Sequence, residues 1–502
     1  MSIRTSAPSE ADIRRLFATS LAPASLVPLA GLILWLDGGL PQGRLGLAAA
    51  PADPRLAAFD GGVEPLPDGL LVKFCPLSHA NARALRTLLP WLAPRPLGLA
   101  TSAGFGDRLG LATPGHVLAL QHALADAPGA TLLPIFAQQS IREMTRTGRS
   151  PDDVMADATW GTLLGGWRGG VGADADHLKT TDDIDRCVAA GFSFYTVDPG
   201  AYVDNDADTD PAATIRAKVD ALPWADLASA PADLARRYVG RVVDLGNRTL
   251  TLDEASVLRG AAKYGAAIAH VSRMARHLVA TGARAELEVS VDETETPTTL
   301  QEHVLFVSEL TRLGVRWVSL APRFVGRFEK GVDYIGDLDA LRADLAGHAA
   351  IARALGPYKL SLHSGSDKFS VYPLIVAATD GLVHLKTAGT SYLEALRVVA
   401  DVDPPLFRDI ATLAREVYPR DRASYHVSAD LARVPSIAAL SDAELPGLLD
   451  QFDAREVLHV TFGTALAEYG DRLKSLLAAN PDAYAATLER HFYRHLAPFV
   501  GI

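Results

Sequence analysis

YKLSLHSGSDK, residues 358–368, has the alternation of a β-strand whose inward-facing residues are polar. Two leucines alternate along it with three polar residues, Lys359, Ser361 and His363. Because successive side chains of a strand point to opposite sides, one side is apolar and the other carries an amine, a hydroxyl and an imidazole. Such a strand suits a barrel, in which outward side chains pack against helices and inward side chains line the interior.

The same rhythm recurs from Pro96 onward. Short apolar runs end in polar or glycine residues, and helix-compatible stretches separate them, several with Thr, Ser or Asp at the N-cap position. The expected strands are PLGLATS (96–102), ATLLPIFAQQ (130–139), GVGADADH (170–177), FSFYTVDP (192–199), AELEVSVDE (285–293), VRWVSLAP (315–322), YKLSLHS (358–364) and LVHLKT (382–387). Eight strand-and-helix units predict a parallel (β/α)8 barrel of the TIM type.

The remaining segments are expected to be additions to this α/β barrel. Residues 1–95 contain short apolar runs cut by Gly, Pro and Asp, which predicts a small β-rich N-terminal subdomain. The catalytic barrel is expected over residues 96–400, with a helical insertion at about 200–284 in its fourth connection. Residues 401–502 contain only helix-like patterns and are expected to form a helical C-terminal extension.

The composition is that of an ordinary globular enzyme. The 502 residues are 48% hydrophobic and carry a net charge of −11, which argues against a nucleic-acid-binding protein. The apolar run 21–36 contains two prolines and is short for a membrane span, and the N-terminus is unlike a signal peptide. Two cysteines, Cys75 and Cys187, allow no disulfide framework. We expect a cytoplasmic enzyme without a nucleic-acid or membrane partner; a homo-oligomer stays open.

The alternation directs a set of ionisable residues into the barrel. They are Asp174 and Asp176; Glu286, Glu288, Ser290 and Asp292; Lys359, Ser361 and His363; and His384 and Lys386. Burying so many charges is costly unless they are paired or functional. Because the active sites of TIM barrels lie at the carboxyl ends of the strands, an active site is the expected explanation.

Carboxylates and histidines together favour a divalent metal ion. His363 ends its strand and His177 follows Asp176, so these two histidines are the first candidate ligands. Strict alternation would point His177 outward, but alternation lapses where a strand ends. Asp176 and Glu288 remain for acid–base chemistry or for further ligation.

Three cations near the expected mouth of the barrel suit an anionic substrate group such as a carboxylate. They are Lys386, Lys368 and Arg323. No P-loop, H-E-x-x-H or G-x-S-x-G pattern occurs, so NTPase, zincin and serine-hydrolase activities have no support. GFGDRLG (104–110) lacks the full G-x-G-x-x-G fingerprint, and no Rossmann unit is expected to hold NAD.

Eight stretches, which span most of the expected barrel, resemble a known family. They are GFGDRLGLATPGH (104–116), QQSIREM (138–144), GADADHLKT (172–180), FYTVDPG (194–200), EVSVDETETPT (288–298), APRFVGRFEKGVDYIGD (321–337), LHSGSDKFSVYP (362–373) and VHLKTAGTSYLEALR (383–397). The family is that of the tagaturonate epimerases, bacterial enzymes that interconvert D-tagaturonate and D-fructuronate. Close relatives act on tagatose and fructose.

The resemblance implies a divalent-metal-dependent epimerase with a barrel-like fold, acting on a sugar acid or a ketohexose. Residue by residue, it implies acid–base roles for Asp176 and Glu288 and metal ligation by His177 and His363. Asp292 and Glu329 are alternatives for a further ligand, and Asp292 is included in the predicted set. The metal is expected to be Zn, Mn, Ni or Co.

The chemistry of this interconversion restricts the mechanisms that are possible. The two sugar acids differ at a hydroxyl-bearing carbon β to the ketone, which enolisation alone cannot invert. Retro-aldol cleavage, rotation of the aldehyde fragment and re-addition can invert it, with a metal ion as Lewis acid and a carboxylate as base. A Schiff base on Lys386 is the second route. The alternative functions are a sugar-acid aldolase or lyase, an epimerase of neutral ketohexoses, and a sugar-binding protein without catalysis.

Overall fold

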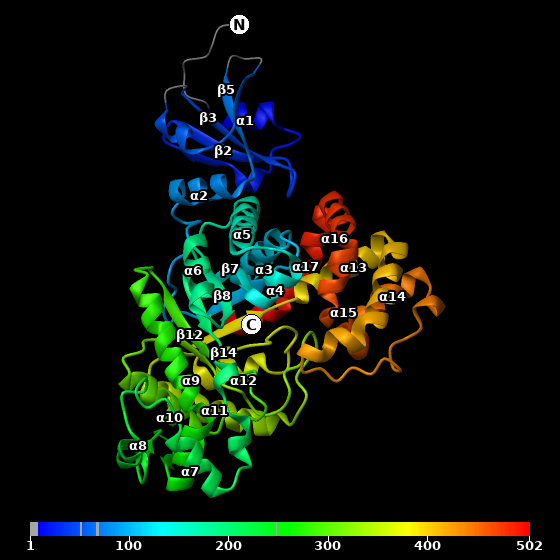
Figure 1. Cartoon of the computed structure of the whole chain (residues 1–502). Coiled ribbons are helices and arrows are strands. Elements are labelled where there is room, and N and C mark those ends of the chain that lie inside the picture. The colour runs from blue at the N-terminus through cyan, green and yellow to red at the C-terminus, as the bar shows by residue number, and fades with distance from the viewer. Residues whose placement is uncertain (1–8, 51–52, 67–69, 247) are drawn as a thin grey trace.

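The computed structural model describes residues 9–50, 53–66, 70–246 and 248–502. Its centre is a closed barrel of parallel strands, each paired with its neighbours along the chain and the last with the first (Figure 1). The strands are β6 (Ser102–Gly106), β7 (Leu133–Ser140), β8 (Gly172–Leu178), β9 (Phe194–Val197), β12 (Glu286–Ser290), β13 (Ser319–Ala321), β14 (Lys359–Leu362) and β15 (Val383–Thr387). The predicted TIM-type barrel is confirmed.

A helix follows each barrel strand and covers the outside of the barrel. These helices are α3 (Thr113–Asp126), α5 (Pro151–Gly165), α6 (Thr181–Ala190), α9 (Glu254–Ala280), α10 (Leu300–Arg312), α11 (Leu338–Leu355), α12 (Tyr372–Thr379) and α13 (Thr390–Val402). Capping boxes start three of them, at Ser150, Thr180 and Thr299. Each such cap satisfies backbone N–H groups that the helix leaves without partners.

The predicted alternation along the strands is confirmed. Leu287, Leu360 and Leu385 belong to the large apolar core that the barrel shares with its helices. The polar residues between them, such as Glu288 and His384, are fully buried and bond across the barrel interior.

The first barrel strand lies further along the chain than predicted. PLGLATS (96–102) is irregular, and the strand occupies Ser102–Gly106 instead. The reason is an interaction at the amino-terminal end of the barrel, where the backbone N–H groups of Leu97 and Gly98 donate to the two carboxylate oxygens of Glu286 at 2.8 and 2.5 Å. The apolar residues of this segment therefore close the bottom of the barrel, and they do not join its wall.

The N-terminal segment forms a separate antiparallel sheet with the strand order β1-β2-β3-β5-β4. Its strands are β1 (Val27–Leu29), β2 (Leu32–Asp37), β3 (Arg44–Ala49), β4 (Gly62–Pro65) and β5 (Leu71–Pro76), accompanied by α1 (Glu10–Leu16) and α2 (His79–Leu88). Helix α2 packs on α5 and so connects this sheet to the barrel (Figure 1). Cys75 in β5 and Cys187 in α6 are both buried and free.

The long fourth connection is only partly helical. It contains α7 (Ala212–Asp220), α8 (Pro231–Tyr238) and the long helix α9, but also an antiparallel pair, β10 (Val242–Asp244) and β11 (Thr249–Thr251). This pair was not predicted from the sequence, because strands of three residues are too short to give a recognisable alternation.

After α13 the described chain consists of helices joined by irregular segments. The main helices are α14 (Pro404–Asp421), α15 (Phe452–Val460), α16 (Phe462–Ala479) and α17 (Pro481–Leu496). Helix α17 packs along α3 on the outside of the barrel (Figure 1), and irregular segments between α14 and α15 reach the barrel mouth. None of the described helices combines the length and hydropathy needed to cross a membrane.

Candidate active site

Lys386 on β15 lies at the centre of the buried acidic cluster. Its Nζ is 2.7 Å from oxygens of Asp174 and Asp176 and 2.8 Å from Glu288 Oε1, and it donates to Thr196 Oγ1 at 2.5 Å. Burial opposes the charged form of Lys386, but the three carboxylates outweigh burial and raise its pKa above the ordinary value. The ammonium therefore stays charged and offsets part of the negative charge inside the barrel.

His177 turns into the site because the backbone departs from strand geometry there. Its φ is 53°, and the pairing register between β8 and β9 shifts next to it. Its Nδ1 lies 2.7 Å from Asp176 Oδ1, whereas Nε2 is 3.8 Å from both Asp292 Oδ1 and Glu293 Oε1. This Nε2 is buried and has no hydrogen-bond partner among the described residues.

His363, just after β14, repeats this arrangement with the two ring nitrogens exchanged. Its Nε2 lies 2.7 Å from Glu288 Oε1, and its Nδ1 lies 3.2 Å from Asp292 Oδ1. The centroids of the His177 and His363 rings are 5.1 Å apart. Each histidine thus gives one nitrogen to a buried carboxylate and presents the other beside Asp292.

The buried carboxylates favour positive charge on and around these two histidines. Burial would lower the pKa of His177, but Asp176 outweighs burial and raises it to about 10. Conversely, burial would raise the pKa of Asp176 and Glu288, but the neighbouring histidines and Lys386 hold both well below the ordinary range. Both carboxylates are therefore ionised at neutral pH. One possible ligand atom each of Asp176, His177 and His363 also lies within 4.8 Å of the others, as the ligands of a metal ion do.

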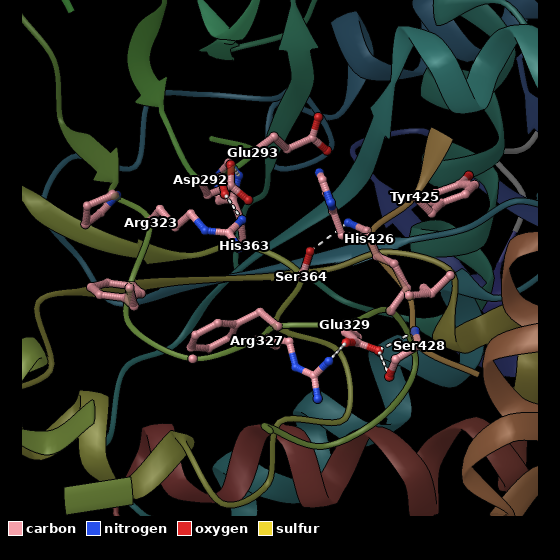
Figure 2. A pocket seen from close by; sticks show the side chains of 16 residues that line it. Asp292, Glu293, Arg323, Arg327, Glu329, His363, Ser364, Tyr425, His426 and Ser428 are labelled. Carbon is pink, nitrogen blue, oxygen red and sulfur yellow. Dashed lines mark hydrogen bonds and ion pairs between the residues drawn. The ribbon is translucent and has the colours of Figure 1, made fainter. Parts of the chain in front are cut away.

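A cavity of about 360 Å³ opens beside Asp292 and His363. Its residues are Asp292, Glu293, Pro322, Arg323, Phe324, Gly326, Arg327, Phe328, Glu329, Lys330, His363, Ser364 and Tyr425 to Ser428 (Figure 2). Arg323 Nη1 donates to the Asp292 carbonyl at 3.3 Å, and Lys330 Nζ donates to Ser364 Oγ at 2.7 Å. Neither cation forms an ion pair with a carboxylate in the part of the chain that the structure describes.

The structure brings together most of the residues singled out from the sequence. Asp176, Glu288, His177, His363, Asp292 and Lys386 form one cluster, and Arg323 lines the adjoining cavity.

Lys368 does not reach this cavity. It is fully buried, and its Nζ donates to the carbonyls of Glu329 and Ser366, at 2.7 and 3.0 Å, and to that of Val332. All three N–H groups are thus used within the chain. This position does not fit the expectation that Lys368 binds substrate. The sequence could not show the difference, because no alternation assigns a direction to a side chain in an irregular loop.

Glu329, the alternative further ligand, lies elsewhere on the cavity wall. Its Oε2 accepts hydrogen bonds from the backbone N–H and the hydroxyl of Ser428 at 2.8 and 2.7 Å. Figure 2 shows it on the side of the cavity away from His363 and Asp292.

Two groups of cavity residues could not be predicted from the alternation of the strands. Lys330 lies in an irregular loop after β13, where no alternation assigns a direction to a side chain. Tyr425 to Ser428 come from the C-terminal extension, outside the barrel repeat. Only the stretch 321–337, quoted above for its resemblance, could have pointed to Lys330.

The comparison with family models decides the family. The model described as tagaturonate epimerase matches residues 61–499, most of the chain. The chain belongs to the tagaturonate epimerase family. This confirms the resemblance seen in the sequence, and it makes the protein an enzyme of the isomerase class, a carbohydrate epimerase.

Individual members of the tagaturonate epimerase family agree with this assignment. The tagaturonate/fructuronate epimerase of Thermotoga maritima is 42% identical over 431 residues, which cover 86% of this chain and 87% of that protein. A crystal structure of the fructuronate-tagaturonate epimerase of Cohnella laeviribosi, complexed with glycerol, has 35% identity and a TM-score of 0.89, covering 98% of this chain and 99% of that one. Its native crystal structure also has a TM-score of 0.89.

Proposed function

We propose that the protein interconverts D-tagaturonate and D-fructuronate in a divalent-metal-dependent reaction. The observation that supports a metal ion is the arrangement of the two histidines around Asp292. Metal-ligating histidines commonly donate their other ring N–H to a carboxylate, which fixes the tautomer and the ring orientation. Asp176 and Glu288 are hydrogen-bonded to His177 Nδ1 and His363 Nε2 in this way.

The proposed ligand atoms are His177 Nε2, His363 Nδ1 and Asp292 Oδ1, because Asp292 Oδ1 lies 3.8 Å from the first and 3.2 Å from the second. The buried His177 Nε2, which lacks a partner among the described residues, supports this set. Asp176 also lies close to both histidines, but its Oδ1 is already hydrogen-bonded to His177 Nδ1 and Lys386 Nζ. When bound, the ion would act as a Lewis acid toward the oxygens of the sugar.

The proposed chemistry is cleavage and re-formation of one carbon–carbon bond. With the keto carbon numbered C2, the proton of the C4 hydroxyl leaves, C4 becomes an aldehyde, and the C3–C4 bond breaks. The electron pair of that bond forms the enediolate over C2 and C3. Rotation of the aldehyde presents its opposite face, and re-addition restores the bond with C4 inverted. No external oxidant or reductant is required.

Asp176 and Glu288 are proposed to carry the proton in these two steps. Each uses one oxygen to hold a histidine and Lys386, and the other oxygen has no hydrogen-bond partner among residues that the structure describes. Lys386 Nζ lies within 2.8 Å of both carboxylates and links the group that accepts the proton to the group that returns it. A Schiff base on Lys386 is disfavoured, because its raised pKa keeps the amine protonated.

Arg323 and Lys330 are proposed to bind the carboxylate of the sugar acid. Both line the cavity beside His363, and neither forms an ion pair with a carboxylate among the described residues. Guanidinium and ammonium groups bind carboxylates through charge-assisted hydrogen bonds. This supports a uronate substrate over the neutral ketohexoses tagatose and fructose, which have no group to pair with these charges.

The test is metal removal followed by product analysis. The protein is treated with EDTA, its metal content is checked by mass spectrometry, and activity on D-tagaturonate is measured before and after adding Mn²⁺, Zn²⁺, Ni²⁺ or Co²⁺. We expect activity to disappear and to return with at least one ion, with D-fructuronate as the product. Full activity of the metal-free protein would contradict the metal dependence. Accumulation of two three-carbon fragments would instead indicate an aldolase.

A further inference from the structure

One wall of the cavity is supplied by the C-terminal extension. Residues 425–428 follow α14 and carry Tyr425, His426 and Ser428 to the side of the cavity away from Arg323 (Figure 2). Val427 is buried, whereas His426 and Ser428 are exposed. We call residues 425–428 the C-terminal wall. The chemistry proposed above makes no use of it.

Two buried glutamates from different parts of the chain meet at this wall. Glu329 comes from the loop after β13, and Glu456 from α15. The backbone N–H of Ser428 donates to Glu329 Oε2 at 2.8 Å and to Glu456 Oε2 at 3.1 Å. The backbone N–H of Ala429 also donates to Glu456 Oε2, at 2.8 Å. The exposed fractions of Glu329 and Glu456 are 4% and 0%.

Because one N–H group reaches an oxygen of each glutamate, the two carboxyl groups lie next to each other. Two ionised carboxylates in such contact repel strongly, so the pair holds one proton and behaves as an acid hydrogen-bonded to a carboxylate. Burial, together with Glu329, raises the pKa of Glu456 to about 8. The protonated pair joins the barrel loop, the C-terminal wall and α15 at a single point.

The charged and titratable groups around the pair leave it without a full counter-ion. Arg327 Nη1 lies 3.4 Å from Glu329 Oε1, but its side chain is 56% exposed. The other neighbours bond to backbone atoms around the wall: Lys368 Nζ to the Glu329 carbonyl, Arg422 to the Val427 carbonyl, Tyr418 to the Ala429 carbonyl and Asp453 to the Asp430 N–H. The contact between the glutamates thus depends on the shared proton.

We propose that the C-terminal wall is part of the substrate-binding site and that Glu456 is the positioning residue that holds it against the barrel. The inference rests on the proposed function only in taking this cavity as the sugar-acid site. Because the pair lies away from His177 and His363, losing it should affect the binding of substrate more than the chemical step. For Glu456→Ala we expect KM to rise about tenfold and kcat to change by less than about threefold.

The experiment measures the position of the C-terminal wall independently of enzymatic activity. Hydrogen exchange of the segment 425–430 is followed by mass spectrometry in the wild type, Glu456→Ala and Glu456→Gln, because the amides of Ser428 and Ala429 are the donors to Glu456. Glu456→Ala should accelerate exchange in this segment at least about tenfold, with barrel peptides unchanged. The amide of Glu456→Gln is neutral like the protonated acid, so exchange and KM should return toward wild-type values.

Glu416→Ala is the matched control, because Glu416 is an exposed glutamate of α14 in the same extension. If Glu456→Ala does not fold, Ser428→Ala removes the hydroxyl bond to Glu329 and should raise KM by itself. Unchanged exchange and KM in Glu456→Ala, or equal effects of Glu416→Ala, would overturn the inference. If the wild type has no activity on D-tagaturonate but Glu456→Ala still accelerates exchange, the positioning role of Glu456 stands and the proposed function is overturned.

Discussion

Lys386 Nζ lies 2.7 Å from Asp176 Oδ1 and so joins β15 to β8 across the inside of the barrel. The same carboxylate oxygen lies 2.7 Å from His177 Nδ1. One buried ammonium therefore sets the position of a carboxylate that in turn sets the orientation of a candidate metal ligand. The chemistry of the site depends on a charge balance that extends beyond the residues facing the cavity.

Removing Lys386 should destabilise the fold. In Lys386→Met, three carboxylates stay buried without their cation, and breaking a buried ion pair in this way costs about 3–5 kcal/mol. Urea denaturation measures the free energy of unfolding. Lys179→Met is the control, because Lys179 is 56% exposed and pairs with the single carboxylate of Asp198 at 3.3 Å, so its loss should cost less than the loss of Lys386. Equal costs for the two variants would contradict the central role of Lys386.

His363 should be required for metal binding. In His363→Ala the nitrogen beside Asp292 is lost, and we expect the metal content of the purified protein, measured by mass spectrometry, to fall from about one ion per chain to near zero. His122→Ala, at a half-exposed histidine far along α3, should keep the wild-type content. Retention of the ion in His363→Ala would remove this histidine from the ligand set.

Asp292 and Glu329 are distinguished by matched amide substitutions. Asp292 Oδ1 lies 3.2 Å from His363 Nδ1, whereas Glu329 bonds to Ser428 on the C-terminal wall. Titration calorimetry of the metal-free protein with Zn²⁺ should therefore show affinity at least about tenfold weaker in Asp292→Asn, and little changed in Glu329→Gln. The opposite order would make Glu329 the ligand.

Arg323 should determine the preference of the enzyme for a charged sugar acid over a neutral sugar. Replacing it with Gln removes a charge-assisted contact to the substrate carboxylate, worth about 1.5–3 kcal/mol, so kcat/KM for D-tagaturonate should fall roughly 10–150-fold. Activity on D-tagatose, however low, should not fall in parallel. Arg342→Gln, at an exposed arginine on α11, serves as control. A parallel loss on both sugars would assign Arg323 a structural role.

Glu456 should make the fold less stable at alkaline pH. Its pKa rises from 4.5 to about 8 on folding, through burial and the neighbouring Glu329. A carboxyl group with a raised pKa stabilises the fold fully below the unfolded pKa, and this contribution is lost as pH rises through the folded pKa. Unfolding free energy should thus decline from pH 4.5 toward pH 8 more steeply in the wild type than in Glu456→Gln. Parallel profiles would contradict a shared proton.

The barrel was predictable because the signal that determines it is local. In β12, β14 and β15 apolar residues must face the helices, so the polar residues between them can only face inward, and Glu288, His363 and Lys386 follow from this alone. The prediction failed at 96–102, where apolar residues cover the barrel's end without pairing as a strand. Apolar composition is the same in both situations, so only tertiary structure separates them.

Residues in loops could not be placed from the sequence for a different reason. The direction of Lys330 and Lys368 depends on loop backbone that no periodicity describes, and one lines the cavity while the other is bonded to three carbonyls. His177 is intermediate: the end of the strand was recognisable, but its left-handed backbone, which turns the ring into the site, was not. The contribution of residues 425–428 needs contacts between segments about 100 residues apart.

The bond between Glu286 and the amides of Leu97 and Gly98 has a consequence for protein engineering. Anyone wishing to isolate the barrel as a minimal catalyst would be tempted to start the chain at Ser102, where the first strand begins. Such a truncation would leave a carboxylate facing the open end of the barrel without its two donors. It would also delete Leu97 and so uncover Ile135 and Phe194, which pack with Leu97. A viable minimal enzyme has to begin before Leu97.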